Sequence, residues 1–256
     1  MTDQPKLLVR KEGAVTVFLL NRPEVRNAVD RELSLMIADA VDAFDRDETV
    51  RVGILAGTGP TFCSGMDLKA FLRGESARLE GRGFAGIVEH PPKKPMIAAV
   101  EGVALAGGFE LALACDLIVA GDTVRMGLPE VRRGLVANAG GLVRLPSQIP
   151  TRIATELILT GEPMTAQRLA EHGLINRVVP AGTALEAARN LARVIAANGP
   201  LALMASKRVI REARDWPVEE LFVRQREITD AVFASDDAKE GARAFAEKRE
   251  PRWQGR

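Results

Sequence analysis

The chain has 256 residues, of which 46% are hydrophobic and 27% are charged, and its formal net charge at pH 7 is +1. This near-average composition excludes a disordered or fibrous protein, and the balanced charge gives no electrostatic footprint for nucleic acid or an anionic membrane. With two histidines, two cysteines and no tyrosine, any proton chemistry falls to carboxylates, lysines or backbone groups.

The first two thirds of the chain alternate predicted strands and helices. Residues 7–20 predict a β-hairpin that turns at Glu12-Gly13. Asp30 then precedes apolar residues with helical spacing over 33–44, which predicts a helix with Asp30 as its N-cap. Further strands are predicted over residues 50–56, 96–100, 117–120 and 175–179. Such alternation is typical of an α/β fold.

From about Pro200 the pattern becomes purely helical. Three helices are predicted there, over residues 201–214, 218–233 and about 237–248. The last begins near Asp237, with Glu240 three residues on in the spacing of a capping box. We therefore divide the chain into an α/β core, residues 1–198, and an all-helical region, residues 199–256.

The sequence carries no recognisable targeting or membrane signal. Residues 1–6, MTDQPK, lack the basic start and apolar stretch of a signal peptide. Acidic residues interrupt the most apolar region, 96–121, so no run reaches the ~20 residues of a membrane span. Cys63 and Cys115 are too few for a disulfide scaffold and are expected to be buried thiols. We expect a soluble, cytoplasmic protein.

One glycine motif resembles a nucleotide-binding pattern but lies in the wrong context. The hexapeptide GRGFAG at residues 81–86 matches the dinucleotide fingerprint, which needs a strand directly before the glycines. Residues 75–80 are instead charged and helix-like, and Pro91-Pro92 follows closely. We expect residues 70–92 to form a flexible loop or lid.

Two glycine-rich turns could present backbone N–H groups to a ligand. Gly65 lies between a predicted strand and a helix near Asp67, where the N–H of Met66 could bind negative charge, although an ordinary turn explains the same residues. Gly107-Gly108 opens a short helix that carries Glu110, and the three-residue spacing places the Gly107 N–H and the Glu110 side chain on one face.

Two glutamates are candidates for proton transfer. Glu110 lies in the otherwise apolar helix 109–115, where an unpaired carboxylate is costly, so an exposed glutamate beside a packing turn is the weaker explanation. Glu130 follows Pro129, which suits a first helical position and places the acid in the first turn. In isolation, Glu130 is equally explained as a surface acid favoured by the helix dipole.

At these segments the chain resembles the crotonase family, also called the enoyl-CoA hydratase/isomerase superfamily. The similar stretches follow one another in order from about residue 15 to about residue 250. They are residues 20–28, 62–68, 101–110, 128–130, 139–141, 160–166, 173–179 and 240–249. The resemblance implies an α/β spiral of repeated ββα turns, with C-terminal helices that mediate trimers pairing into hexamers.

The resemblance also implies roles for individual residues. Met66 and Gly107 would supply two backbone N–H groups that hold the oxygen of an acyl-CoA thioester. Glu110 and Glu130 match the two glutamates of the family's hydratases, the first acting chiefly on water and the second on the α-proton. Matches to substrate and CoA contacts are Val25, Ala28, Ser64, Asp67, Leu68, Pro129, Phe245 and Lys248, the last two often reaching CoA from a neighbouring subunit. No metal or separate cofactor is implied, since CoA is part of the substrate.

The chain departs from the family pattern at three places. Met66 stands where many hydratases have alanine, Ala106 replaces the first of three glycines, and Ala137-Asn138 replaces Pro-Gly. The expected activity is hydration of a 2-enoyl-CoA. The alternatives are 3,2-enoyl-CoA isomerisation, dehydration of a 3-hydroxyacyl-CoA such as carnitinyl-CoA, and silent acyl-CoA binding. Both acids together favour water chemistry, because isomerases commonly keep only one.

Overall fold

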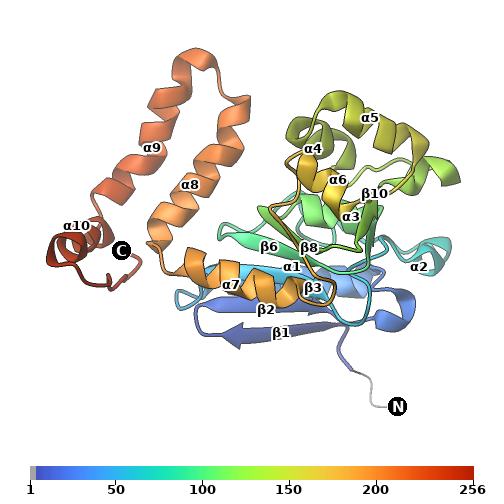
Figure 1. The fold of residues 1–256 in the computed structure, drawn as a ribbon, viewed down its shortest axis with the longest axis horizontal. Coiled ribbons are helices and arrows are strands. Elements are labelled where there is room, and N and C mark those ends of the chain that lie inside the picture. The colour runs from blue at the N-terminus through green and yellow to red at the C-terminus, as the bar shows by residue number, and fades with distance from the viewer. Residues whose placement is uncertain (1–3) are drawn as a thin grey trace.

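A six-stranded sheet runs through the core of the computed structural model, which describes residues 4–256 (Figure 1). Its strands, in spatial order, are β1 (Leu7–Glu12), β2 (Val15–Leu20), β3 (Val52–Gly57), β6 (Met96–Val100), β8 (Leu117–Gly121) and β11 (Arg177–Val179). The β1–β2 hairpin is antiparallel and every other pair is parallel. All six residues of β2 are buried, as expected for a sheet that is covered on both faces.

Helices cover the two faces of this sheet. On one face, α7 (Ala184–Ala196) buries an alanine every fourth residue and packs closely on β2, β3, β6 and β8. On the other face lies α1 (Arg31–Arg46), whose buried residues include Leu33, Ile37 and Val41. The Asp30 carboxylate accepts a hydrogen bond from the Leu33 N–H at 2.9 Å, which confirms the predicted cap.

A smaller sheet makes the repeats of the fold visible. It consists of β10 (Met164–Thr165), β9 (Arg125–Gly127) and β7 (Val103–Leu105), in that order. The chain leaves the large sheet at β6, enters the small one at β7 and continues into α3 (Gly107–Leu113). It then repeats this path from β8 through β9 into η2 (Pro129–Arg133), a 3-10 helix. Two successive ββα units therefore lie side by side, as the resemblance implied.

Shorter helices complete the core. They are η1 (Pro23–Val25), α2 (Leu68–Leu72), α4 (Gly141–Gln148), α5 (Thr151–Thr160) and α6 (Ala166–Glu171). The first of them precedes α1, and α2 follows β3 along the chain. Helices α4 to α6 lie together above the small sheet in Figure 1.

The segment of residues 70–92, which was expected to form a flexible loop or lid, packs in part against α1, and its flexibility stays a prediction. It contains β4 (Arg78–Leu79) paired with β5 (Gly83–Phe84), and no helix over 75–80. The Arg82 guanidinium donates hydrogen bonds to the Asp42 carboxylate of α1. Gly86 approaches α1 so closely that a Cβ atom there would lie 2.6 Å from the Ser34 carbonyl oxygen. Gly83 and Gly86 of the hexapeptide therefore permit close packing, whereas Gly81 faces open space.

The last quarter of the described chain is an arm of helices. It consists of α8 (Pro200–Glu212), η3 (Ala213–Asp215), η4 (Val218–Glu220), α9 (Leu221–Phe233) and α10 (Asp236–Glu247). Helices α8 and α9 form a hairpin that projects away from the core in Figure 1, and neither contains a buried residue. In the described chain β11 is the last strand, so the structure is purely helical from α7 onward; the arm begins at α8, and the division into two domains stays a prediction.

The predicted capping box at Asp237 and Glu240 is wrong. Ser235 caps α10, since its hydroxyl oxygen accepts from the Ala238 N–H at 3.0 Å. Asp237 is buried and instead accepts hydrogen bonds from the N–H groups of Gln254, at 2.7 Å, and Gly255, at 2.9 Å. Glu240 likewise binds the tail, through Arg249 and the Arg252 N–H. Both acids hold the chain end against α10.

Replacing Asp237 with alanine should release this tail. The substitution leaves two N–H groups without their buried carboxylate, so we expect Asp237→Ala to lower the free energy of unfolding by about 2 kcal/mol. Asp236→Ala is the matched control, because the neighbouring carboxylate is exposed and pairs only with Lys239; it should cost less than about 1 kcal/mol. Urea denaturation and limited proteolysis of the tail measure the difference. Equal effects of the two substitutions would contradict the assignment.

Candidate active site

Two turns bring the N–H groups of Met66 and Gly107 into one place. Gly65 has φ of +99°, and a Cβ atom there would lie 3.1 Å from the Gly107 nitrogen. The Val29 N–H donates to the Gly65 carbonyl at 2.8 Å, and the Asp67 N–H donates to the Val29 carbonyl at 2.9 Å. In this parallel bridge the N–H of Met66 points away from Val29. Within residues 4–256, neither the Met66 N–H nor the Gly107 N–H donates to a protein acceptor.

A strained residue orients the second of these N–H groups. Ala106 has φ of 52° and ψ of −129°, a conformation that costs a residue with a side chain of order 1–3 kcal/mol. Its N–H donates to the Gly127 carbonyl at 2.9 Å, and its carbonyl accepts from the N–H groups of Phe109 and Glu110. These bonds hold the turn, so that α3 begins with the Gly107 N–H directed out of the helix.

Glu110 lies in α3 with only 3% of its surface exposed. Its Oε1 atom accepts two hydrogen bonds of 2.8 Å, from the N–H groups of Ala139 and Gly141. Burial raises the pKa of this carboxyl to about 7, and the nearby negative charge of Glu130 adds to the rise, while the two N–H donors oppose it. The pKa of Glu110 therefore lies where the group can both take up and release a proton near neutral pH.

Glu130 lies in the first turn of η2, where Pro129 begins the helix and Gly134 ends it with φ of +67°. The carboxyl is 9% exposed, and its buried Oε2 atom has no hydrogen-bond partner among the described residues. Burial raises the pKa of this carboxyl as well. The site thus contains two buried acids, of which Glu110 is held by backbone N–H groups and Glu130 has an oxygen left for a ligand.

The residues predicted to contact CoA near the N-terminus lie on adjacent segments. The Ser64 N–H donates to the Arg26 carbonyl at 3.0 Å, which joins the stretch containing Val25 and Ala28 to the loop before α2. Leu68 opens α2 and is 45% exposed. These positions form one continuous rim next to Met66.

Asp67 already has protein partners. Its carboxylate accepts from the N–H groups of Lys69 and Ala70, which caps α2, and it forms an ion pair of 3.0 Å with Arg22. These bonds hold the pKa of Asp67 below its usual value against the opposing effect of burial. The structure thus gives Asp67 a role in shaping the loop that carries Met66.

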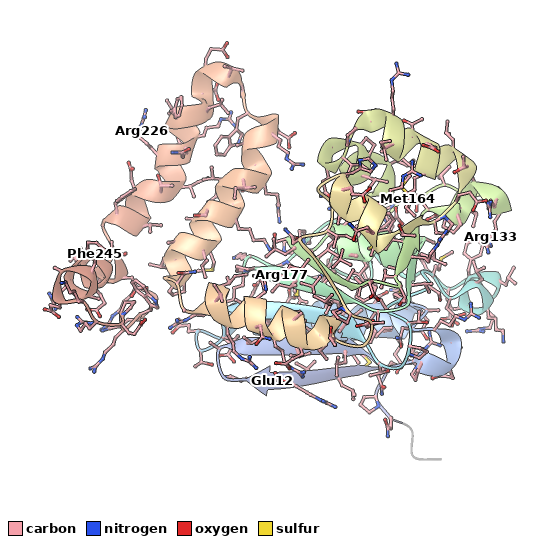
Figure 2. All side chains as sticks on the ribbon, in the orientation of Figure 1. Glu12, Arg133, Met164, Arg177, Arg226 and Phe245 are labelled. Atoms are coloured by element: carbon pink, nitrogen blue, oxygen red, sulfur yellow. The ribbon has the colours of Figure 1, made fainter. Side chains whose placement is uncertain are left out.

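Two predicted CoA contacts lie far from this site within one chain. Phe245 is 88% exposed on α10, at the opposite side of the molecule from Arg133 and Met164 in Figure 2. Lys248 ends the same helix. Within one chain, Phe245 thus lies away from Arg133 and from the η2 helix that carries Glu130.

Sequence reasoning missed Asn27, which ties the turn before α1 to the loop after β3. This residue is fully buried with φ of 55°, a conformation that asparagine tolerates better than most residues. Its side chain accepts from the Arg22 N–H at 2.8 Å and donates to the carbonyls of Thr58, at 3.0 Å, and Thr61, at 2.7 Å. The sequence signal was weak, because Asn27 follows the charged Arg26 and only the residues after it, Ala28 and Val29, are apolar.

The N–H donors of Ala139 and Gly141 were matched to the family but given no role. A Cβ atom at Gly141 would lie 3.0 Å from Oε1 of Glu110, so this glycine permits the close approach.

Within residues 4–256, no group of three or more His, Cys, Asp and Glu side chains is arranged to hold a metal ion. In the same part of the chain, the helices are too short or too polar to cross a membrane.

Known proteins resemble this chain over nearly its full length. The model of the enoyl-CoA hydratase/isomerase family matches residues 10–256. Enoyl-CoA hydratase EchA19 of Mycobacterium tuberculosis is 43% identical, over 98% of this chain and 97% of that protein. Carnitinyl-CoA dehydratase of Salmonella arizonae is 42% identical, over 97% of this chain and 98% of that protein.

Solved structures agree with these relatives. Enoyl-CoA hydratase EchA1 from Mycobacterium marinum superposes with a TM-score of 0.97 at 53% identity, covering 99% of this chain and all of that one. A carnitinyl-CoA hydratase from Mycobacterium avium superposes with a TM-score of 0.79 at 45% identity, over 99% of this chain and all of that one. The predicted crotonase-like α/β fold with a helical C-terminal region is confirmed.

The raised pKa of Glu110 predicts that stability falls as the pH rises. The unfolded glutamate titrates near 4.5 and the folded one near 7, so between these values the folded state binds more protons and loses stability with increasing pH. We expect Glu110→Gln to be more stable than the wild type by on the order of 2 kcal/mol at about pH 8, with the difference vanishing below about pH 5. Urea denaturation at both pH values tests this. Exposed Glu24→Gln is the control, and a pH-independent effect of Glu110→Gln would contradict the shift.

Proposed function

This chain belongs to the enoyl-CoA hydratase/isomerase family, and from that membership we propose that it adds water across the 2,3-double bond of a 2-enoyl-CoA thioester. Its relatives mark it as a lyase with hydratase-type function. The observation that carries the specific reaction is a pair of buried glutamates together with two backbone N–H groups that donate to no acceptor within residues 4–256. The product is a 3-hydroxyacyl-CoA.

The two N–H groups would bind the thioester oxygen. When hydroxide adds to C3, negative charge moves onto this oxygen as an enolate forms, and the N–H groups of Met66 and Gly107 stabilise it. Gly107 is the first residue of α3, so the helix dipole favours the same charge. Because both donors are fixed by the fold, they need no reorganisation as the charge develops.

The glutamates would move the protons. Oε1 of Glu110 is held by the Ala139 and Gly141 N–H groups, which leaves Oε2 to accept a proton as water attacks C3. Burial favours the protonated form of Glu130, which delivers its proton to C2. Water thus supplies the hydroxyl on C3 and leaves its proton on Glu110, while the hydrogen on C2 comes from Glu130. Proton exchange with solvent then returns Glu110 to its ionised form and Glu130 to its protonated form.

Dehydration of a 3-hydroxyacyl-CoA is the second candidate. It uses the same groups in reverse, and relatives named carnitinyl-CoA dehydratase, which are 40–42% identical, favour it. Asn138 bears on the efficiency of the reaction in both directions, because its N–H donates to the Val136 carbonyl at 2.9 Å. A backbone N–H that is already bonded in this way is not available to a catalytic water at that position.

We further propose a homotrimer or a dimer of trimers. The arm exposes the apolar side chains of Ile210, Val218, Phe222, Val223, Phe233 and Phe245. Burial in a neighbouring subunit would remove this surface from water and would carry Phe245 and Lys248 toward a second chain's CoA. The remaining proposals are a cytoplasmic location, no metal or separate cofactor, and no nucleic-acid or membrane partner.

An acyl-CoA panel tests the reaction. Wild-type protein is incubated in ¹⁸O-labelled water with short- and medium-chain 2-enoyl-CoAs, 3-enoyl-CoAs and 3-hydroxyacyl-CoAs, and the products are analysed by mass spectrometry. A hydratase places label on C3, whereas an isomerase moves the double bond without it.

Glu110→Gln and Glu130→Gln should each reduce turnover by about 10²-fold or more while CoA-thioester binding persists. Binding without turnover by the wild type would indicate a silent acyl-CoA-binding protein.

Gly65→Ala tests the oxyanion site. The added methyl group would lie 3.0 Å from the Leu105 carbonyl oxygen and 3.1 Å from the Gly107 nitrogen, so it disturbs the geometry of both N–H donors. We expect kcat to fall by about 10²-fold or more. Gly13→Ala is the matched control, because Gly13 also has positive φ, at +63°, but faces open space. An unchanged kcat in folded Gly65→Ala would rule out these donors.

A further inference from the structure

Arg144 lies next to the turn that holds Glu110. It is the fourth residue of α4, and its backbone N–H donates to the Gly140 carbonyl at 2.8 Å. The side chain reaches the Val88 carbonyl oxygen and donates a hydrogen bond to it. The guanidinium is therefore fixed at one end by a residue that is remote in sequence.

The guanidinium also packs directly on Gly140. This glycine has φ of +101°, and a Cβ atom there would overlap Nη1 of Arg144, with a separation of only 2.1 Å. Gly140 lies between Ala139 and Gly141, whose N–H groups bind the Glu110 carboxylate. The Arg144 guanidinium thus packs on the turn that carries the two N–H donors to Glu110.

The charges around this pair are few. Arg144 and Glu130 both act on Glu110, the first favouring its ionised form and the second opposing it. Burial lowers the pKa of Arg144, the positive charge of Arg211 in α8 adds to this effect, and Glu110, Cys115 and Glu89 oppose it. Burial also raises the pKa of Cys115 to about 12, so this thiol stays neutral. Arg144 is thus a cation that acts against the burial and like-charge effects on Glu110.

We propose that Arg144 is a positioning residue for Glu110. Its guanidinium lies between Val88 and Gly140, fixes the turn whose N–H groups bind the Glu110 carboxylate, and keeps a positive charge close to that carboxylate. The catalytic part of this assignment rests on the proposed hydratase function. Arg144 does not touch the substrate. Its effect is to keep Glu110 in one orientation and ionised often enough to accept a proton from water.

The test compares Arg144→Gln with Arg208→Gln, which alters an exposed arginine of α8 that pairs with Glu212. Glutamate labelled with ¹³C allows the Glu110 carboxyl to be titrated by NMR, its signal being identified by its absence in Glu110→Gln. We expect the midpoint to rise by about one pH unit in Arg144→Gln and to stay unchanged in the control. Turnover of the best enoyl-CoA should fall about fivefold near pH 7 and recover at high pH.

Each outcome decides the assignment. An unchanged Glu110 midpoint, or an equal loss of turnover at every pH, would overturn it, since a purely structural role predicts the latter. If Arg144→Gln does not fold, Arg144→Lys is used, because one amine cannot both bond Val88 and cover Gly140. Faster hydrogen exchange at the Ala139 and Gly141 amides then supports the role, and wild-type exchange overturns it. A shifted midpoint in a protein that turns over no acyl-CoA would leave the positioning intact and reject the proposed function.

Discussion

The site depends on two neighbouring ββα turns whose backbones touch. A Cβ atom at Gly108 would lie 2.2 Å from the Cys63 carbonyl oxygen, and one at Gly102 would lie 1.9 Å from that of Pro60. Only glycine permits such contact. The Leu105 N–H donates to the Cys63 carbonyl at 3.1 Å and so fixes the two turns in register. The N–H of Met66 from one turn and that of Gly107 from the next therefore converge, although 41 positions separate them in the sequence.

This contact also explains why Glu110 is buried. Helix α3 starts at the contact and passes through the core, where every one of its residues is buried. A carboxylate there destabilises the fold in its charged form, and the fold compensates with the N–H groups of Ala139 and Gly141. The resulting tension between burial and hydrogen bonding sets the pKa of Glu110 near neutrality. The buried carboxylate thus lowers the stability of the fold, and the same burial gives Glu110 the pKa that proton transfer requires.

The sequence correctly predicted those elements that depend on interactions between residues close together in the chain. The hairpin at residues 7–20 and the Asp30 cap depend on neighbours within a few positions, and both were correct. The predictions failed where distant partners decide. Residues 75–80 have helical composition, yet Ser34 and Asp42 of α1 hold the surrounding segment beside α1. Asp237 had the spacing of a cap, but the returning tail offers its carboxylate two N–H groups, which leaves Ser235 to cap the helix.

The candidate site followed the same division. Glycines at 65 and 107 and acids at 110 and 130 were visible in the sequence as possible donors and proton carriers. Their supports were not, because Asn27 and Arg144 act through carbonyls remote in sequence, those of Thr58 and Val88 among them.

The arm is tied to this site through the sheet rather than through α3. Lys207 of α8 donates to the Lys94 carbonyl at 2.8 Å and to the Asp116 carboxylate at 2.6 Å, and the same carboxylate accepts from the Met96 N–H at 2.7 Å. Met96 begins β6, whose other end leads through β7 to Gly107. The Lys207 side chain is only 10% exposed, whereas that of Asp116 is 30% exposed, so water has little access to the ammonium group and the ion pair favours one docking geometry. The direction in which the arm leaves the core is therefore fixed by the strand that also delivers the oxyanion turn.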